Sequence, residues 1–176
     1  MMIQRLSLIS GARKARGLTV VIDVFRAFTT AAVVMANGAD RIVPVGSLEE
    51  AFALRRLHPD WVLMGERGGK RVEGFDYGNS PWEVRDVDFT GRTVVQTTGA
   101  GTQGVVNAEG AETILLGSFV TAGAIIERIR RTQPEVVSLV AMGNNGVEPN
   151  AEDEQCAAYI EAGLRGDPLD FKEIKR

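Results

Sequence analysis

Short apolar runs rich in β-branched residues alternate with helical segments along most of the chain, and this alternation constrains the fold more than any other feature. Such runs are typical of strands buried on both faces of a sheet. The expected strands are residues 18–25, 40–46, 61–66, 92–98, 111–119 and 135–143. The expected helices are residues 26–39, 47–60, 101–110, 121–134 and 151–166. Strands that alternate with helices predict an α/β fold in which a mostly parallel or mixed sheet is layered between helices, α/β/α.

The chain shows no linker, repeat or low-complexity segment that would divide it. Its 176 residues, 44% of them hydrophobic, suit one domain with a sizeable core. Residues 1–176 are therefore expected to form a single α/β domain. A closed homodimer is the commonest assembly of soluble proteins, and it is the one expected here.

Composition excludes several classes of protein. The net charge of −3 argues against a nucleic-acid surface, and the single cysteine, Cys156, excludes an internal disulfide and a thiolate zinc cluster. No segment approaches the roughly 20 apolar residues of a membrane span, and the N-terminus lacks a signal-peptide pattern. We therefore expect a cytoplasmic protein with no membrane or nucleic-acid partner. Because the one histidine, His58, lies at an expected helix end, chemistry is expected from carboxylates, hydroxyls and arginines, with a hard metal ion left open.

Polar side chains gather where the expected strands end. In open α/β sheets, ligands bind at the carboxyl ends of the strands. The side chains at these ends are Asp23, Arg26, Thr29, Thr30, Glu66, Arg67, Thr97, Thr98, Ser118, Thr121, Asn144, Asn145, Glu152, Asp153 and Glu154. Carboxylates, arginines and hydroxyls are thus predicted to share one edge of the sheet.

The segment TVVQTTGAGTQGVV contains the glycine spacing of a dinucleotide-binding loop, G-x-G-x-x-G, at residues 99–104. A dinucleotide site also needs an acidic residue at the end of the next strand, and here the nearest one, Glu112, stands at its start. A glycine-rich turn without a ligand is a second interpretation. We favour a third, in which the loop and its threonines bind a small phosphate or sulfonate through N–H groups and hydroxyls.

Two acidic features each allow a structural and a functional interpretation. Asp23 interrupts an apolar run, so it is paired with Arg26, caps a helix, or is used as a catalytic or metal-binding carboxylate. Phe25 occupies the second position of the Asp-x-Asp pattern of aspartyl phosphatases, which disfavours that mechanism. The acidic run at residues 152–154 suits the first turn of a helix and could equally supply an oxygen ligand to Mg²⁺. The glycine-rich loop at residues 67–84 carries both charge signs and is more typical of a functional loop than of a simple connection.

Taken in order, the segments VIDVFRAFTTAAVVMANGA, MGERGG, EGFDYGNSPWEV, GRTVVQTTGAGTQGVVNA, LLGSFVTAGAI and EDEQCAAYI resemble the motifs of the 2-phosphosulfolactate phosphatase (ComB) family. The resemblance extends from about Thr19 to Ile160, and GFDYGNSP is its most distinctive part. It implies a layered α/β fold and a Mg²⁺-dependent phosphoric monoester hydrolase. The implied reaction converts 2-phospho-3-sulfolactate to 3-sulfolactate and phosphate, a step of coenzyme M biosynthesis; a related small phosphorylated hydroxy acid is an open alternative.

The resemblance also implies site residues. The matching positions are Asp23, Arg26, Thr29, Thr30, Glu66, Asp76, Asn79, Ser80, Thr97, Thr98, Gly101, Thr102, Ser118, Glu152 and Asp153. Our hypothesis assigns catalysis to Asp23, Arg26, Glu66 and Asp76, and magnesium binding to Asp23, Glu66, Asp76, Glu152 and Asp153. The segment Thr97–Thr102 would hold one anionic group, and Arg67 or Lys70 would take the second. Either Asp23 or Asp76 would orient or deprotonate the attacking water.

Two rival functions remain at this point. Members of the family continue for several tens of residues past the EDEQC helix, whereas this sequence ends soon after it. A natural short form, a truncated product and a domain completed by a partner are all open. A chain of this kind could therefore be an anion-binding or assembly protein without turnover. A nicotinamide enzyme is the other alternative, and it predicts stabilisation by NAD without a metal.

Overall fold

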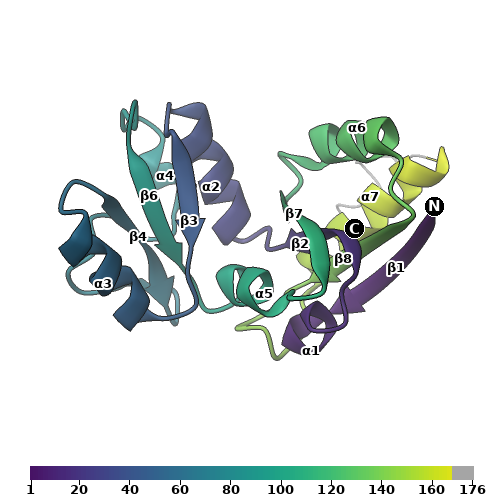
Figure 1. Ribbon diagram of the computed structural model, residues 1–176, viewed down its shortest axis with the longest axis horizontal. Helices are drawn as coiled ribbons and strands as arrows, with labels where there is room; N and C mark the ends of the chain where they lie inside the picture. The colour runs from purple at the N-terminus through teal and green to yellow at the C-terminus, as the bar shows by residue number, and fades with distance from the viewer. Residues whose placement is uncertain (168–176) are drawn as a thin grey trace.

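A computed structural model describes residues 1–167 (Figure 1), and its strands form two four-stranded sheets. In the first sheet, in spatial order, lie β1 (Met2–Ser7), β8 (Val136–Ala141), β2 (Gly17–Ile22) and β7 (Ala111–Gly117). All its neighbouring strands are parallel. In the second sheet lie β3 (Arg41–Pro44), β6 (Thr93–Thr97), β4 (Val62–Arg67) and β5 (Lys70–Arg71). Its first three strands are parallel, and β5 is antiparallel to β4.

Helices cover both faces of each sheet. They are α1 (Leu8–Ala12), α2 (Ala27–Ala36), α3 (Leu48–Leu57), α4 (Pro81–Val84), α5 (Gly101–Asn107), α6 (Ala122–Thr132) and α7 (Ala151–Arg165). In the first sheet, Val20 and Ile22 point toward α6 and α7, while Val21 points toward α1 and α5. In the second sheet, the α3 face and the face of α2 and α4 each enclose a separate core cluster. The helices therefore explain why the strands are apolar on both faces.

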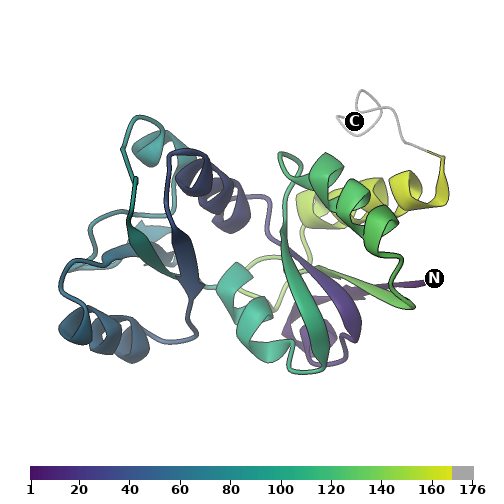
Figure 2. The same ribbon diagram turned by 45° about the horizontal axis from the view of Figure 1, so that its top comes forward.

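The chain passes from the first sheet to the second and back. The outward connection is α2, and the return connection is α5 (Figures 1 and 2). Phe28 and Ala31 on α2 pack into the core of the first sheet, whereas Val34 packs into the core of the second. One helix thus belongs to both cores and holds the two sheets together.

The α/β class and the mostly parallel pairing are confirmed, while the expectation of one sheet is wrong. The sequence pattern locates each strand from β2 onward except the two-residue β5, but it does not show which strands pair. The N-terminal strand β1 and helix α1 were not expected either. The strand predicted for residues 18–25 ends at Ile22, because the backbone turns at Asp23 to enter α2. The single-domain organisation of the whole chain stays a prediction.

Side chains cap the first turns of two helices. Ser47 caps α3, since its hydroxyl accepts the N–H of Glu50 at 3.1 Å in a Ser-x-x-Glu sequence of the capping-box type. Asn150 caps α7 in the same way through the N–H of Asp153 at 3.0 Å. Within residues 1–167, none of the helices has the length and apolar character needed to cross a membrane.

Candidate active site

The carboxyl ends of strands from both sheets surround a cleft of about 360 Å³. The cleft is lined by Asp23, Phe25, Arg26, Glu66, Gly68, Gly69, Asn79, Ala100, Gly143, Asn144 and Asn145. These residues come from the loops that follow β2, β4, β6 and β8, and from the segment before α4. The predicted gathering of polar groups at the strand ends is therefore observed, although two sheets rather than one supply them.

Asp23 lies at the centre of this arrangement and is 6% exposed. Its Oδ1 accepts the N–H of Ala27 at 3.0 Å, and its Oδ2 accepts the N–H of Gly101 at 2.8 Å. One carboxylate therefore joins the loop after β2 to the loop after β6. Burial raises the pKa of Asp23 to about 7, and the negative charges of Asp153 and Glu66 add to the rise, while the two backbone hydrogen bonds oppose it.

Asp153, in the first turn of α7, joins a second pair of loops. Its Oδ1 accepts the N–H of Val24 at 2.8 Å, and its Oδ2 accepts the N–H of Gly143 at 2.9 Å. Its side chain is buried, and that burial raises the pKa of Asp153. Asp153 thus fixes the Asp23 loop against the end of β8.

Glu66, at the end of β4, joins a third pair. Its Oε1 accepts the N–H of Gly99, and its Oε2 accepts the N–H of Gly69, both at 2.7 Å. The hairpin that connects β4 to β5 is thereby tied to the glycine loop after β6. Glu66, Asp23 and Asp153 together link four strand-end loops across the two sheets. None of these three carboxylates takes part in the ion pairs found among residues 1–167.

Most of the N–H groups in the glycine loop are bonded within the protein, and its glycines allow close packing. Those of Gly99 and Gly101 donate to carboxylates, and Thr98 and Thr102 bond to each other through hydroxyl and backbone groups. A Cβ on Gly101 would lie 2.8 Å from the Ala27 Cβ, and one on Gly104 would overlap the Met142 sulfur. The G-x-G-x-x-G spacing therefore lets α5 pack closely on the first sheet. Anion binding by Thr97–Thr102 stays a prediction.

Arg26 and Asn79 each bring to the cleft a polar group that has no hydrogen-bond partner among the described residues. The Arg26 side chain makes no hydrogen bond or ion pair with any residue in the described part of the chain, and it lines the cleft beside Asp23. Asn79 is 7% exposed, yet its Oδ1 has no hydrogen-bond partner among the described residues. An unpaired buried acceptor costs about 1–3 kcal/mol, so Asn79 is suited to a donor or cation brought by a ligand.

Several predicted site residues lie behind the cleft rather than on its wall. Thr29 and Thr30 donate their hydroxyls to the carbonyls of Val24 and Arg26, which shapes the turn into α2. The other residues in this group are Ser80 at the N-cap of α4, Ser118 bonded to Thr121, Thr97 bonded to Arg67, and Glu152 in the first turn of α7. None of these side chains is among the residues that line the cleft. Lys70 is exposed on β5 and is likewise not among the lining residues.

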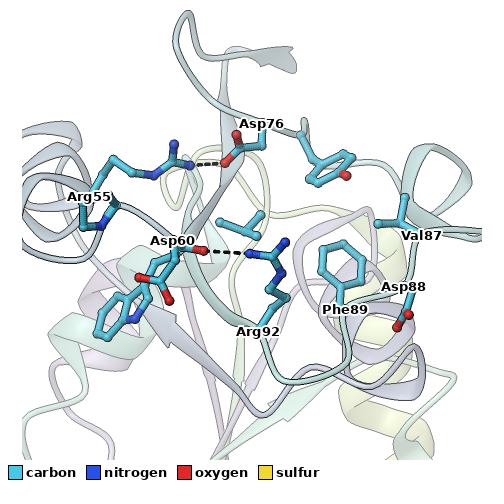
Figure 3. Close-up of a pocket in the computed structure, with 11 residues that line it drawn as sticks. Arg55, Asp60, Asp76, Val87, Asp88, Phe89 and Arg92 are labelled. Carbon is cyan, nitrogen blue, oxygen red and sulfur yellow. Dashed lines mark hydrogen bonds and ion pairs between the residues drawn. The ribbon is translucent and has the colours of Figure 1, made fainter.

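Asp76 is the largest correction to the sequence-based site. Its Oδ2 accepts the N–H of Leu63 at 2.7 Å and forms an ion pair with Arg55 of α3 (Figure 3). Leu63 is near the start of β4, so Asp76 lies at the amino end of the second sheet and lines a different hollow. Asp76 therefore does not lie with Asp23 and Glu66 in the cleft.

Phe25, Asn144 and Asn145 also line the cleft, although none of them was assigned a catalytic, binding or metal role from the sequence. Asn144 and Asn145 follow β8 directly, which is the same strand-end signal that identified Asp23 and Glu66. Asn145 has a left-handed backbone (φ 52°), and its Oδ1 lies 2.7 Å from where a Cβ on Gly99 would be. Asn145 thus lies over the glycine loop.

The thiol can be set aside as a nucleophile. Cys156 is buried on α7, and that burial raises the pKa of its thiol to about 12. It stays protonated at physiological pH, whereas the reactive form is the thiolate. The chemistry of the cleft rests on carboxylates, amides and Arg26.

A cleft at the carboxyl ends of parallel strands, lined by buried carboxylates and an unpaired arginine, is typical of a functional site in an α/β protein. The sequence model of the family described as 2-phosphosulpholactate phosphatase matches residues 4–175. The chain belongs to this family.

Curated relatives agree with that assignment. The chain is 40% identical over 145 residues to a probable 2-phosphosulfolactate phosphatase of Caldicellulosiruptor saccharolyticus, covering 80% of this chain and 60% of the relative. It is 38% identical over 142 residues to a protein of the same description from Clostridium acetobutylicum, with the same coverage. A third such protein, from Carboxydothermus hydrogenoformans, is 40% identical over 141 residues, which is 80% of this chain and 58% of the relative. The chain spans about 60% of the length of the curated relatives that it matches.

Proposed function

We propose that this protein hydrolyses phosphate monoesters of small hydroxy acids, with 2-phospho-3-sulfolactate as the first candidate substrate. The observation that carries the proposal is the unpaired Arg26 beside the buried Asp23, in a cleft whose chemistry suits the activity for which the family is named. Phosphoryl transfer depends mainly on positioning and on neutralising the charge of the phosphoryl oxygens. Arg26 supplies that positive charge.

In the proposed reaction, water attacks phosphorus and the bond between phosphorus and the ester oxygen breaks. The alcohol oxygen gains a proton, the water loses one, and the products are a hydroxy acid and inorganic phosphate. Asp23 orients the attacking water and accepts its proton, because its pKa of about 7 suits proton exchange near neutral pH. Asp76, the other carboxylate considered for this role, lies at the opposite end of β4.

Magnesium is part of the proposal. The groups that fit it are the carboxylates of Asp23 and Glu66 and the unpaired Oδ1 of Asn79, all oxygen ligands in one cleft. Within residues 1–167, no group of three or more acidic, histidine or cysteine side chains encloses a metal position, so the cage of carboxylates expected from sequence is not formed. Mg²⁺ commonly binds through one or two carboxylates and keeps several waters. When bound, it would polarise a phosphoryl oxygen.

The test is phosphate release from 2-phospho-3-sulfolactate and a panel of phosphorylated hydroxy acids, with Mg²⁺ and with EDTA. The proposal predicts release that needs Mg²⁺ and that ranks the panel by the second anionic group. A non-activity measurement of the metal accompanies it: Mg²⁺ is titrated calorimetrically into the wild type, Asn79→Ala and Glu66→Gln. Both variants are expected to bind Mg²⁺ at least about ten-fold more weakly.

The rival functions give different outcomes. A folded protein that binds 3-sulfolactate and releases no phosphate from any substrate would be an anion-binding relative of the family, and the phosphatase proposal would be wrong. Thermal stabilisation by NAD in the absence of Mg²⁺ would instead support the dinucleotide interpretation. The packing of Gly101 and Gly104 against Ala27 and Met142 argues against that outcome.

A further inference from the structure

The segment that carries Asn79 into the cleft is anchored at the opposite edge of the second sheet. Asp76 and Tyr77 both donate their N–H groups to the carbonyl of Leu63, at 3.0 and 3.2 Å, and the Tyr77 carbonyl accepts the N–H of Gly65 at 3.1 Å. Met64 and Tyr77 form a parallel bridge. The segment therefore runs beside β4, on the side away from β6, from the amino edge of the sheet toward the cleft.

The start of this segment is held by α3. Phe75 is buried and contacts Phe52 edge to face, with ring centroids 5.4 Å apart. The next residue, Asp76, forms the ion pair with Arg55 and accepts the N–H of Leu63 (Figure 3). Among the described residues, Arg55 forms an ion pair with Asp76 and with no other carboxylate. Its buried Nε has no hydrogen-bond partner there. Arg55 is thus committed to Asp76.

The end of the segment is held more lightly. Gly78 donates its N–H to Glu83 at 3.0 Å, and Asn79 follows with its side chain buried and its Oδ1 unpaired among the described residues. Only Tyr77 and Gly78 separate Asp76 from Asn79, and Tyr77 is itself bonded to β4 through Leu63 and Gly65. The position of Asn79 is therefore set largely by where Asp76 is fixed.

We propose that the Arg55–Asp76 ion pair is a positioning device that holds Asn79 in place in the cleft from the far edge of the sheet. This inference deepens the proposed function and rests on it for the role of Asn79 in phosphate release. Arg55 and Asp76 touch neither substrate nor metal and act only through the segment between them. The distinctive GFDYGNSP motif then has a physical reason: its aspartate anchors the segment and its asparagine is presented to the ligand.

The first experiment needs no ligand. The side-chain amide resonances of Asn79, assigned with Asn79→Ala, are recorded in the wild type, Arg55→Gln and Asp76→Asn. Asp76→Asn retains an oxygen for the N–H of Leu63 and removes only the charge. We expect both variants to shift or broaden the Asn79 resonances and to leave those of Asn144 and Asn145 unchanged. Arg56→Gln, which neutralises the adjacent exposed arginine of α3, is the matched control and should change none of them.

The second experiment is a double-mutant cycle on phosphate release. A displacement of about 1 Å can cost up to about 100-fold in rate, and we expect Arg55→Gln to lower kcat by roughly ten-fold in the wild-type background. In the Asn79→Ala background the same substitution should change kcat by less than about two-fold, because Asn79 is the group through which it acts. A purely structural role would give the same loss in both backgrounds.

The outcomes separate this inference from the proposed function. Unmoved Asn79 resonances in both Arg55→Gln and Asp76→Asn would overturn the positioning role, and so would additive losses in the cycle. Shifted resonances in a protein that releases no phosphate would uphold the positioning role while the proposed activity fails.

Discussion

Asp76 and Asp23 lie at opposite ends of the sheet strands, and their surroundings differ in charge and in burial. Asp76, at the amino edge of the second sheet, is paired with Arg55, and its side chain is 39% exposed. Asp23, in the cleft at the carboxyl edges, is buried and bonded only to backbone N–H groups, with the carboxylates of Asp153 and Glu66 nearby. A charge neutralised within the protein serves its architecture, whereas a buried charge without a counter-ion is typical of a functional site.

The same contrast holds for the arginines. In the hollow beside Asp76, of about 280 Å³, Arg92 donates to the carbonyl of Asp60 at 3.3 Å (Figure 3). In the cleft, Arg26 has no partner among the described residues. Both arginines of the hollow are therefore bonded within the protein, whereas Arg26, Asp23 and Glu66 of the cleft form no ion pair among the described residues.

The largest expected effect is on turnover. Arg26→Ala should lower kcat/KM for phosphate release by about 10²–10³-fold, because it removes charge stabilisation aimed at the phosphoryl oxygens. Arg92→Gln, in the hollow, is the control and should leave kcat/KM within about two-fold of wild type. Both are measured by steady-state kinetics on proteins whose melting temperatures are compared first. Equal losses in the two variants would erase the distinction between cleft and hollow.

The next effect concerns pH and stability. Since the folded-state pKa of Asp23 is about 7 and its ordinary value is 3.8, the folded protein binds more protons than the unfolded chain between these values. The free energy of unfolding should therefore be highest below about pH 4 with respect to this group and fall as pH rises to 7. The loss is at most about 4 kcal/mol at 1.36 kcal/mol per pKa unit.

Urea unfolding of the wild type, Asp23→Asn and Asp153→Asn from pH 4 to 8 measures that slope. Asp23→Asn should remove most of it, and Asp153→Asn should reduce it, since the raised pKa of Asp153 acts in the same direction. Saturating Mg²⁺ should flatten the wild-type slope by favouring the ionised carboxylate. If the pH dependence of the free energy of unfolding is unchanged in Asp23→Asn, a group other than Asp23 causes it.

A smaller effect distinguishes close packing from ligand binding in the glycine loop. Gly104→Ala should cost about 1–3 kcal/mol of stability, because its Cβ would overlap the Met142 sulfur and lie 2.5 Å from the Val21 Cγ1. Gly68→Ala at the hairpin tip meets no atom within 4 Å and tests the backbone term alone, since φ is +58° there. The stabilities of the two variants are compared by their midpoints of denaturant unfolding. An unchanged midpoint for Gly104→Ala would contradict the packing interpretation.

The smallest effects are expected at two helix caps, one on α3 near the hollow and one on α7 near the cleft. Ser47→Ala removes the cap of α3, and Asn150→Ala removes the cap of α7; each should cost about 1 kcal/mol. Only Asn150→Ala should also alter kcat, because its Oδ1 holds the N–H of Asp153 beside the cleft. A matched change in kcat for both variants would mean that helix stability, rather than local geometry, sets the activity.

Much of the fold is predictable because it follows from local patterns. The buried run of β2, the capping box at Ser47 and the cap of α7 are encoded within a few neighbouring residues. The strand-end rule likewise identifies Asp23, Arg26 and Glu66 from their places in the sequence. The strand β1 escapes prediction because it is an edge strand in which polar residues break the apolar run.

The sequence by itself determined the α/β class, most element positions and the chemical types gathered at the strand ends. The tertiary structure alone decided that the strands divide into two sheets, that Asp23 and Glu66 meet at the glycine loop, and that Asp76 does not. Asp76 and Asn79 are three residues apart in one loop, yet only contacts with β4 and α3 assign them to opposite edges of a sheet. Pairing across long sequence separations is set by hydrogen bonds and packing between distant segments, and no local pattern carries that information.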